Sequence, residues 1–414
     1  MKMNAYVAGV GMVPFGKHLD KTLKGLAGQA IQLALNDAGL DKTQLQAAWM
    51  GNAAAGVVTG QEMIRGEVVL RGMGIGKIPV VNVENACASS STAFQQACAM
   101  VSAGYYDIVL VCGYEKLFHE DKARSLGAFS SAIDVEDPEG AMNVVKKLAE
   151  AAGEPFDVTG AGSSRSVFMD IYALMAKKHM KQYGSTAEHF AMIAAKNSFH
   201  GSLNERAQFR DVLSVEQVLG ARSIVDPLTL PMCSPIGDGA AAVVVVSERK
   251  ARQLGLRNPV RVAASALVSG WDFEQAGESV GALAAQQVYA ASGIGPQDLS
   301  CVELHDASAP SELMAYEYLG LCAPGGGTRL LESGATHLGG RLPVNASGGL
   351  LRKGHPIGAS GCAQIVELTE QLQGRAGARQ VDNARIGLAH NGGGAIGLDA
   401  AATVVTLLVR ENLR

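Results

Sequence analysis

Val81-Asn-Val-Glu-Asn-Ala-Cys-Ala-Ser-Ser-Ser-Thr-Ala-Phe94 places one cysteine, Cys87, where an apolar strand pattern gives way to a helix pattern. Residues 78–83 before it are rich in β-branched side chains, and residues 93–101 after it supply an apolar helical surface. A thiol at the start of a helix faces unpaired N–H groups, which should lower its pKa and could hold an oxyanion. Cys87 is therefore either a nucleophile or, as free cysteine often is, a small buried apolar residue.

The composition is that of a compact globular protein. The 414 residues are 48% hydrophobic and 18% charged, and the net charge of −4 gives no reason to expect nucleic-acid binding. Seven cysteines, an odd number, favour a reducing compartment, and we expect a cytoplasmic protein. No apolar run approaches the roughly 20 residues that span a bilayer. Residues 1–10 read as a first strand rather than a leader.

Two stretches of the chain repeat one pattern, which indicates a duplicated α/β unit. Residues 30–51 lie over residues 284–305 at a constant offset, with Leu40 opposite Ile294. Strand and helix patterns alternate in the first copy, and this favours a parallel α/β sheet. Such a duplication creates a seam where strand ends meet, and open α/β sheets bind ligands in crevices at strand ends.

We divide the chain at the points where this alternation stops and resumes. The parts are an N-terminal half (1–115 with 236–258), an inserted lid-like loop domain (116–235) and a C-terminal half (259–414). Within the insert, residues 172–183 and 187–198 predict helices. Residues 118–162 are polar and read as irregular, and residues 208–226 read as a mobile-looking connector.

Three segments of the second copy carry unusual residues. His305 ends a predicted strand opposite Gly51 of the first copy, so the repeat does not require it. His355 stands between a glycine and a proline before a predicted helix, roughly where Cys87 stands in the first copy. Three consecutive glycines follow closely after His390, and such a run lets backbone N–H groups approach a ligand. The plainer alternatives are a core imidazole, a turn residue and a tight turn.

A nucleophile, imidazoles to activate it and N–H groups for an oxyanion are the parts of covalent acyl transfer. The cysteine segment, residues 345–361 and residues 387–397 resemble the thiolases in order and spacing. Within that family, His305-Asp306 and the His-Asn-Gly at 390–392 look like the sterol-carrier-protein class, and His-Asp-Ala is also found in archaeal-type thiolases. The resemblance implies an α/β protein with a five-layered αβαβα fold and two mixed sheets.

The resemblance also implies that the inserted domain, residues 116–235, binds CoA, and it implies roles for individual residues. Cys87 would take the acyl group and His355 would activate it. His305 would join His355 in an oxyanion hole for the thioester oxygen of the nucleophilic acyl-CoA. The N–H groups of Cys87 and Gly392 would form a second hole, around the acyl-enzyme carbonyl. Ser234 falls where thiolases contact the pantetheine arm, and neither a metal nor a cofactor beyond the CoA substrates is expected.

One part of the thiolase pattern is missing. Many thiolases use a second cysteine to remove a proton from the α-carbon of the acyl donor. Its two usual positions are here His390 and Ala307. His390 or His305 could act as the base instead.

The sequence therefore predicts a thiolase-type acyltransferase that performs 3-ketoacyl-CoA thiolysis or Claisen condensation through an acyl-Cys87 intermediate. The first alternative is acyl transfer to a non-CoA acceptor, or acyl-CoA hydrolysis. The second is a non-catalytic acyl-CoA or lipid-binding subunit of a complex. The resemblance further implies a homodimer or homotetramer, and archaeal-type thiolases add an OB-fold/zinc-ribbon partner protein.

Overall fold

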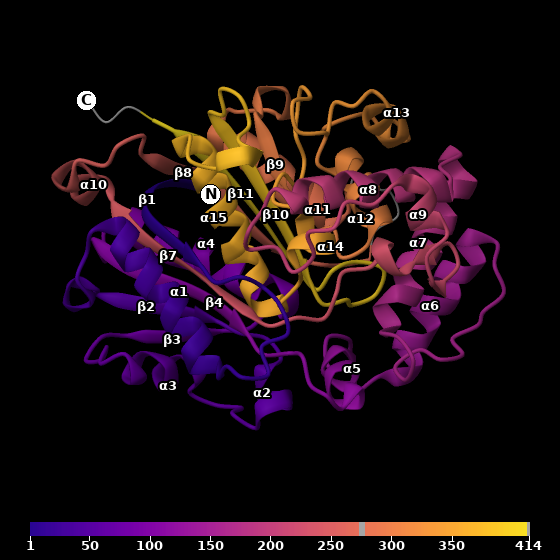
Figure 1. Ribbon diagram of the computed structural model, residues 1–414, viewed down its shortest axis with the longest axis horizontal. Helices are drawn as coiled ribbons and strands as arrows, with labels where there is room; N and C mark the ends of the chain where they lie inside the picture. The colour runs from indigo at the N-terminus through magenta and orange to yellow at the C-terminus, as the bar shows by residue number, and fades with distance from the viewer. Residues whose placement is uncertain (273–277, 412–414) are drawn as a thin grey trace.

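The computed structural model describes residues 1–272 and 278–411, and its main sheet has nine strands (Figure 1). They are β1 (Lys2–Met12), β2 (Ala47–Gly51), β3 (Val80–Val83), β4 (Ile108–Glu115), β7 (Gly239–Ser247), β8 (Val260–Ser269), β9 (Cys301–Glu303), β10 (Ile386–Gly393) and β11 (Ala402–Arg410). Their order across the sheet is β3-β2-β4-β7-β1-β8-β11-β10-β9. A separate ribbon contains β5 (Ser223–Val225) and β6 (Leu228–Thr229).

The helices follow the strands of each half or belong to the insert. They are α1 (Leu23–Ala38), α2 (Ala55–Thr59), α3 (Arg65–Gly72), α4 (Ser89–Ser102), α5 (Lys122–Ser130), α6 (Pro138–Ala152), α7 (Val167–Tyr183), α8 (Ala187–Ser202), α9 (Val215–Leu219), α10 (Glu248–Leu254), α11 (Val280–Ser292), α12 (Ala309–Tyr318), α13 (Gly327–Glu332), α14 (Gly349–Lys353) and α15 (Ser360–Gln373). The side chain of Thr22 caps the start of α1, which ends at Gly39 in a left-handed conformation.

The two halves of the sheet have the same topology, which confirms the predicted duplication. In the first half β2 pairs parallel with β4, and β4 pairs antiparallel with β7. In the second half β9 pairs parallel with β10, and β10 pairs antiparallel with β11. The first strands of the two copies, β1 and β8, pair antiparallel, with Val7 opposite Val260. The family resemblance implied two sheets, and the pairing of β1 with β8 joins them into one hydrogen-bonded sheet.

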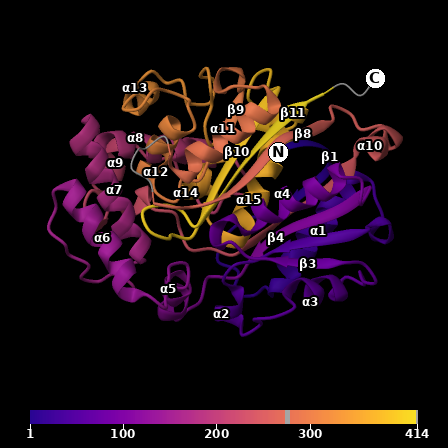
Figure 2. The ribbon, with the colours of Figure 1, turned by 180° about the vertical axis from the view of Figure 1, so that it is seen from behind.

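Helices α4 and α15 form a layer between the two halves of the sheet, as both ribbon views show (Figures 1 and 2). Phe94 of α4 and Val366 of α15 share one buried core with strand residues such as Val111. A second core lies between α1 and the first half of the sheet, and a third lies between α11, α12 and the second half. The cores therefore separate five layers in the order αβαβα, as expected.

Between β4 and β7 the chain forms α5 to α9, which lie together on the right of Figure 1. The expectation that residues 118–162 are irregular was wrong, because α5 and α6 occupy most of them. Helix α6 starts with an Asp137 cap and Pro138, and buries Leu148 and Ala152 on one side. Its four-residue apolar spacing was hidden by the polar residues around it.

The remaining expectations for the insert hold in part. Helices α7 and α8 contain the predicted segments 172–183 and 187–198 and extend beyond them. The predicted connector at 208–226 contains α9, which begins at a Ser214–Gln217 capping box, and strand β5. The division of the chain into three parts at residues 115, 235 and 258 stays a prediction.

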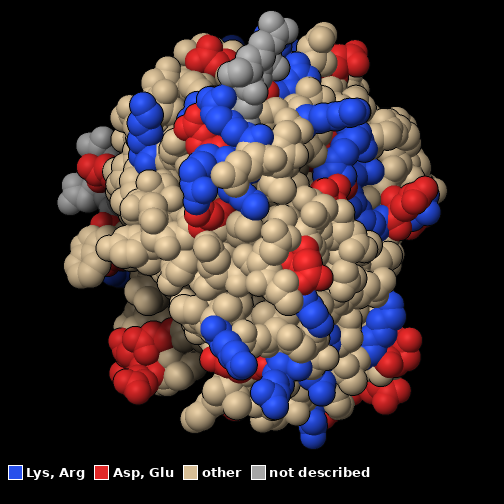
Figure 3. Space-filling model, turned by 90° about the vertical axis from the view of Figure 1, so that its left-hand side faces the viewer, with Lys and Arg blue, Asp and Glu red and all other residues tan. Residues whose placement is uncertain are grey.

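The surface carries charges of both signs. On the face in Figure 3, lysine and arginine side chains lie beside aspartate and glutamate among uncharged residues. Among residues 1–272 and 278–411, no helix has both the length and the apolar character needed to cross a bilayer.

The two central helices approach each other through small residues at their N-terminal ends. A Cβ added to Gly361 of α15 would lie 2.5 Å from the backbone nitrogen of Ser91 in α4. The hydroxyl of Ser90 accepts a hydrogen bond from the N–H of Cys362 at 3.0 Å. This contact fixes the spacing of the two helix N-termini, and only glycine fits at position 361 without moving the backbone.

We predict that Gly361→Ala lowers the free energy of unfolding by about 1–3 kcal/mol, because the added methyl group overpacks the helix crossing. Gly127→Ala is the matched control, since Gly127 is an exposed residue of α5 with open space where the Cβ would go. That change should be neutral or stabilise by up to about 1 kcal/mol. Urea unfolding followed by circular dichroism measures both, and equal stability of the two variants would contradict the assigned contact.

Candidate active site

Cys87 lies in the short turn Ala86–Ala88 that leads from β3 into α4, on the wall of a cavity of about 1520 Å³. Ala86 has a positive φ of 48°, a conformation that L-residues rarely adopt. Burial and the nearby Glu115 carboxylate raise the pKa of the Cys87 thiol to about 12. The N–H groups of Cys87 and Gly394 act in the opposite direction without outweighing them. The expectation of a lowered thiol pKa was therefore wrong, and the resting residue is a thiol.

His355 lies in the second copy near the position that Cys87 has in the first. It stands two residues before the turn Ile357–Ala359 that leads into α15, whereas Cys87 lies inside the corresponding turn before α4. Its Nδ1 lies 2.8 Å from the hydroxyl of Ser360, which also lies 3.1 Å from the carbonyl of Pro356. We assign the hydroxyl proton to Pro356, so that Ser360 accepts from Nδ1–H and Nε2 of a neutral His355 keeps a free lone pair. Burial holds the pKa of His355 well below its usual value, so the ring is neutral.

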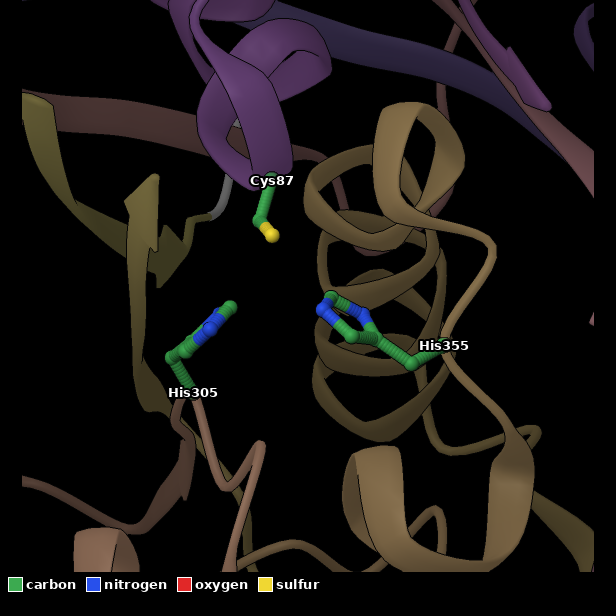
Figure 4. A group of neighbouring side chains, drawn as sticks. All are labelled: Cys87, His305 and His355. Carbon is green, nitrogen blue, oxygen red and sulfur yellow. The ribbon is translucent and has the colours of Figure 1, made fainter. Parts of the chain in front are cut away.

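His305 follows β9 and completes a group of three reactive side chains (Figure 4). One reactive atom each from Cys87, His305 and His355 lie within 4.8 Å of one another. The rings of His305 and His355 are edge-to-face with centroids 5.2 Å apart. The sequence prediction that Cys87 and these two imidazoles converge is borne out in their placement.

The protonation of His305 is set by Asn391. The amide nitrogen of Asn391 lies 3.4 Å from Nδ1 of His305, and its oxygen lies 3.3 Å from the hydroxyl of Ser91, which is also 2.9 Å from the carbonyl of Ala88. With the amide in this orientation its N–H donates to Nδ1 of His305, and the proton of the neutral ring lies on Nε2. Burial lowers the pKa of His305 to about 4, which keeps this ring neutral as well. The two imidazoles beside Cys87 are thus opposite tautomers.

His390 lines the cavity but does not belong to the group of three. It lies on β10, and its Nδ1 accepts the backbone N–H of His305 at 3.4 Å. Its ring packs against Tyr318 with centroids 5.3 Å apart. Burial lowers the pKa of His390 to about 3, so it is neutral with its proton on Nε2.

The glycine segment approaches Cys87 from β10. Gly393 packs against the turn before α4 so closely that a Cβ would collide with the carbonyl of Asn85. Gly392, the predicted oxyanion-hole residue, also lines the cavity. The N–H groups of Cys87 and Gly394 both act to lower the pKa of the Cys87 thiol. Gly394 is the third glycine of the run that the sequence singled out, whereas the predicted oxyanion-hole residue was Gly392.

Ser234, the predicted contact of the pantetheine arm, also lines the cavity. Its N–H donates to the carbonyl of Ala307 at 3.0 Å, which ties the segment to the loop that carries His305. Ser234 thus lies at the cavity wall, and its predicted contact with the pantetheine arm stays a prediction.

Three residues that support the site escaped the sequence analysis. Ser360 and Asn391 orient the two imidazoles, and only their places beside His355 and His390 hinted at a role. Glu115 is a buried carboxylate that accepts N–H groups from Ala54 at 3.2 Å and Gly358 at 2.9 Å. It joins the loops of both copies next to Cys87. Its position in the sequence could have indicated a role, because Glu115 is a charged residue at the end of a buried, valine-rich strand.

The group formed by Cys87, His305 and His355 also has the spacing of a metal site, the one such group within the described parts of the chain. Cysteine and histidine are the ligands that Zn²⁺ prefers. Nε2 of His305 carries a proton, however, and ligation through it would require the other tautomer against the amide of Asn391. The protonation pattern favours a nucleophile with its base over a metal site.

Comparisons with known proteins agree with this chemistry. Sequence models of the thiolase N-terminal domain and the thiolase C-terminal domain-like family match residues 5–249 and 273–407. Benzoylsuccinyl-CoA thiolase subunit BbsB of Thauera aromatica is 38% identical over 95% of this chain and 96% of its own length. An acetyl-CoA acetyltransferase of Methanothermobacter thermautotrophicus is 37% identical over 95% and 97%.

Two further similarities extend these. Sterol carrier protein 2 of Bos taurus is 35% identical over 98% of this chain and 72% of its own length. The solved structure of an Ltp2-ChsH2(DUF35) aldolase matches with a TM-score of 0.76 and 26% identity over 99% of both chains. The resemblance inferred from the motifs is thereby confirmed, and this chain belongs to the thiolase family as an acyltransferase.

Proposed function

We propose that this enzyme forms an acyl-Cys87 intermediate from an acyl-CoA or 3-ketoacyl-CoA, and passes the acyl group to CoA or to the α-carbon of acetyl-CoA. The observation that carries the proposal is the convergence of Cys87, His305 and His355 within 4.8 Å at the wall of a large cavity. A nucleophile, a base and hydrogen-bond donors are then in place around one reacting carbonyl carbon.

Each group has one part in the acylation step. Nε2 of His355 takes the thiol proton while the sulfur attacks, because the thiol does not ionise on its own at neutral pH. The backbone N–H groups of Cys87 and the glycine segment, at Gly392 and Gly394, stabilise the oxyanion on the acyl carbon. Nε2–H of His305 donates to the thioester oxygen of the second substrate.

The cavity favours substrates with bulky apolar acyl groups. Its volume of about 1520 Å³ exceeds the roughly 300–1,000 Å³ of common ligand pockets. Apolar side chains of the insert line it, among them Phe118, Leu126, Phe129, Leu148, Phe168 and Met175. This leaves room for an acyl group beside a pantetheine arm at Ser234. The relative from Thauera aromatica, named as a benzoylsuccinyl-CoA thiolase, supports this choice of substrate class.

We also propose that the chain assembles with further subunits in the cytoplasm. Strand β3 is the terminal strand of the sheet, and its outer edge is free to pair with a second copy in a homodimer. A partner with an OB-fold and zinc ribbon is supported by the names of two similar proteins, a thiolase subunit and an Ltp2-ChsH2(DUF35) complex. The seven free cysteines favour a reducing compartment.

The absence of a second cysteine favours one alternative, in which the acyl group passes to water or another acceptor. A 3-ketoacyl-CoA substrate separates the two functions. Release of acetyl-CoA with consumption of CoA supports thiolysis, whereas release of free CoA and a carboxylic acid from an acyl-CoA supports hydrolysis.

We predict that incubation with an acyl-CoA adds one acyl group per chain, at Cys87, because this thiol has a base and oxyanion donors around it. Intact-protein mass spectrometry measures the adduct, and peptide mapping assigns it. Cys87→Ser should lose the adduct, whereas Cys322→Ser, a change at a half-buried cysteine outside the cavity, should keep it. An unmodified wild-type protein, or an adduct that survives Cys87→Ser, would refute the proposed function.

We further predict that the acylation rate is nearly constant between about pH 6 and about pH 9, because a neutral His355 removes the proton. The pKa of His355 is shifted downward, so its base form is lost only when the pH falls through that lowered value. The variant His355→Asn keeps a hydrogen-bond donor for Ser360 but removes the base. Its acylation rate should be slower than that of the wild type and should rise about tenfold per pH unit as the Cys87 thiolate forms. A wild-type rate that rises in the same way would contradict the assigned base.

A further inference from the structure

Carbon–carbon chemistry needs a group that moves a proton to or from the α-carbon, and this chain lacks a cysteine at both positions where thiolases carry one. The replacements are His390 and Ala307. If the proposed function is right, another side chain at the cavity must move that proton. The hydrogen bonds around the three imidazoles decide which one can.

Two of the imidazoles present a proton to the cavity and no lone pair. Nδ1 of His390 accepts the backbone N–H of His305, and Nδ1 of His305 accepts from the amide of Asn391. Each ring therefore carries its proton on Nε2. Burial holds both rings neutral, and a neutral imidazole N–H is a hydrogen-bond donor rather than a base or a useful acid. His305 and His390 can stabilise an enolate oxygen but cannot deprotonate carbon.

Two tyrosines and a second cysteine that line the cavity keep their protons. Burial raises the pKa of Tyr172 and Tyr318 far above neutrality, so both hydroxyls stay protonated. The thiol of Cys233 faces the carbonyl of Thr229 at 3.6 Å, and burial raises its pKa to about 12.

The carboxylates that line the cavity are engaged as well. Asp211 pairs with Arg352 at 2.7 Å. Glu317 accepts from His179 at 3.1 Å, and Asp399 accepts the N–H of Val280 at 2.6 Å. Among the three imidazoles of the described active site, His355 is the one whose Nδ1 proton is held by Ser360 and whose Nε2 lone pair is open to the cavity beside Cys87.

We propose that His355 is the single proton carrier of the reaction and serves both the sulfur and the α-carbon, with His390 acting only as a hydrogen-bond donor. In cleavage, Nε2 takes the thiol proton as the sulfur bonds to the 3-keto carbon. The C2–C3 bond then breaks, its electron pair goes to the enolate of acetyl-CoA, and His355 delivers the same proton to that carbon. The thiol hydrogen ends on the methyl group of acetyl-CoA, so no second acid is required.

The reverse step uses the same atom. When Cys87 is acylated and CoA has left, His355 is neutral again and its lone pair faces the second substrate. It takes a proton from the methyl group of acetyl-CoA, and the charged ring and Nε2–H of His305 then face the enolate oxygen. The hydrogen bond from Nδ1 to Ser360 keeps Nε2 directed to the cavity throughout.

Exchange of the methyl protons of acetyl-CoA with D₂O tests this role without any acyl transfer. The experiment uses Cys87→Ala, which cannot be acylated, and follows deuterium in acetyl-CoA by mass spectrometry. Two double variants each add one substitution to Cys87→Ala, either His355→Asn or His390→Asn. Asparagine can keep the Nδ1 contact of each ring while it removes Nε2. His189→Asn is the control for the substitution itself, since His189 lies on α8 outside the cavity.

Cys87→Ala and its combination with His189→Asn should catalyse exchange. Adding His355→Asn should slow exchange by about 100-fold or more, the contribution of a general base. Adding His390→Asn should slow it less than about tenfold. Binding of acetyl-CoA, measured by calorimetry, shows that each variant is folded and able to bind. Loss of exchange with His390→Asn alone, exchange that survives His355→Asn, or no exchange in Cys87→Ala would overturn the proposal.

These outcomes are separate from those of the acylation experiment. An acyl adduct on wild-type Cys87 together with exchange that depends on His390 would retain the proposed function and remove only the single-carrier role. A missing adduct would remove the proposed function whatever the exchange experiment gives.

Discussion

The packing of α4 against α15 is the constraint on which the site depends. Cys87 lies in the turn that leads into α4, and His355 lies just before the turn that leads into α15, so the distance between the helix N-termini sets the distance between sulfur and imidazole. Gly361 and Ser91 allow that approach. The buried Glu115 carboxylate of the first copy accepts the N–H of Gly358 in the second copy and links the two copies there. The duplicated fold has thus placed different chemistry close to corresponding positions of its two halves.

Burial then determines what each group can do. The same desolvation that keeps Cys87 a thiol keeps the surrounding imidazoles neutral, so proton positions are set by hydrogen bonds and not by solution pKa values. Asp306, next to His305, accepts the N–H of Leu350 at 2.7 Å and the amide of Asn197 at 2.9 Å. That contact links the His305 loop to α14, which leads to His355, and to α8 of the insert. The catalytic loops and the cavity wall are therefore one hydrogen-bonded unit.

Much of this arrangement could be predicted from the sequence, because strong local patterns encode it. The repeat, the strand-to-helix junction at Cys87 and the Gly-His-Pro segment at His355 gave the duplicated fold and the converging residues. Helix α6 was missed because its apolar spacing is diluted by polar residues, and the single sheet was missed because the β1–β8 pairing is long-range. The direction of the thiol pKa shift was wrong because local sequence reveals the helix N-terminus but neither the burial of the thiol nor the carboxylate of Glu115, which both arise only in three dimensions.

The chemistry of the site depends on two neutral imidazoles of opposite tautomer that flank one thiol. Nitrogen-15 NMR of the histidine-labelled protein measures the proton position on each ring directly, with signals assigned from His355→Asn and His305→Asn. We expect a protonated Nδ1 and a bare Nε2 for His355, and the reverse for His305. A bare Nε2 on His305, or a proton on Nε2 of His355 in the resting enzyme, would contradict it.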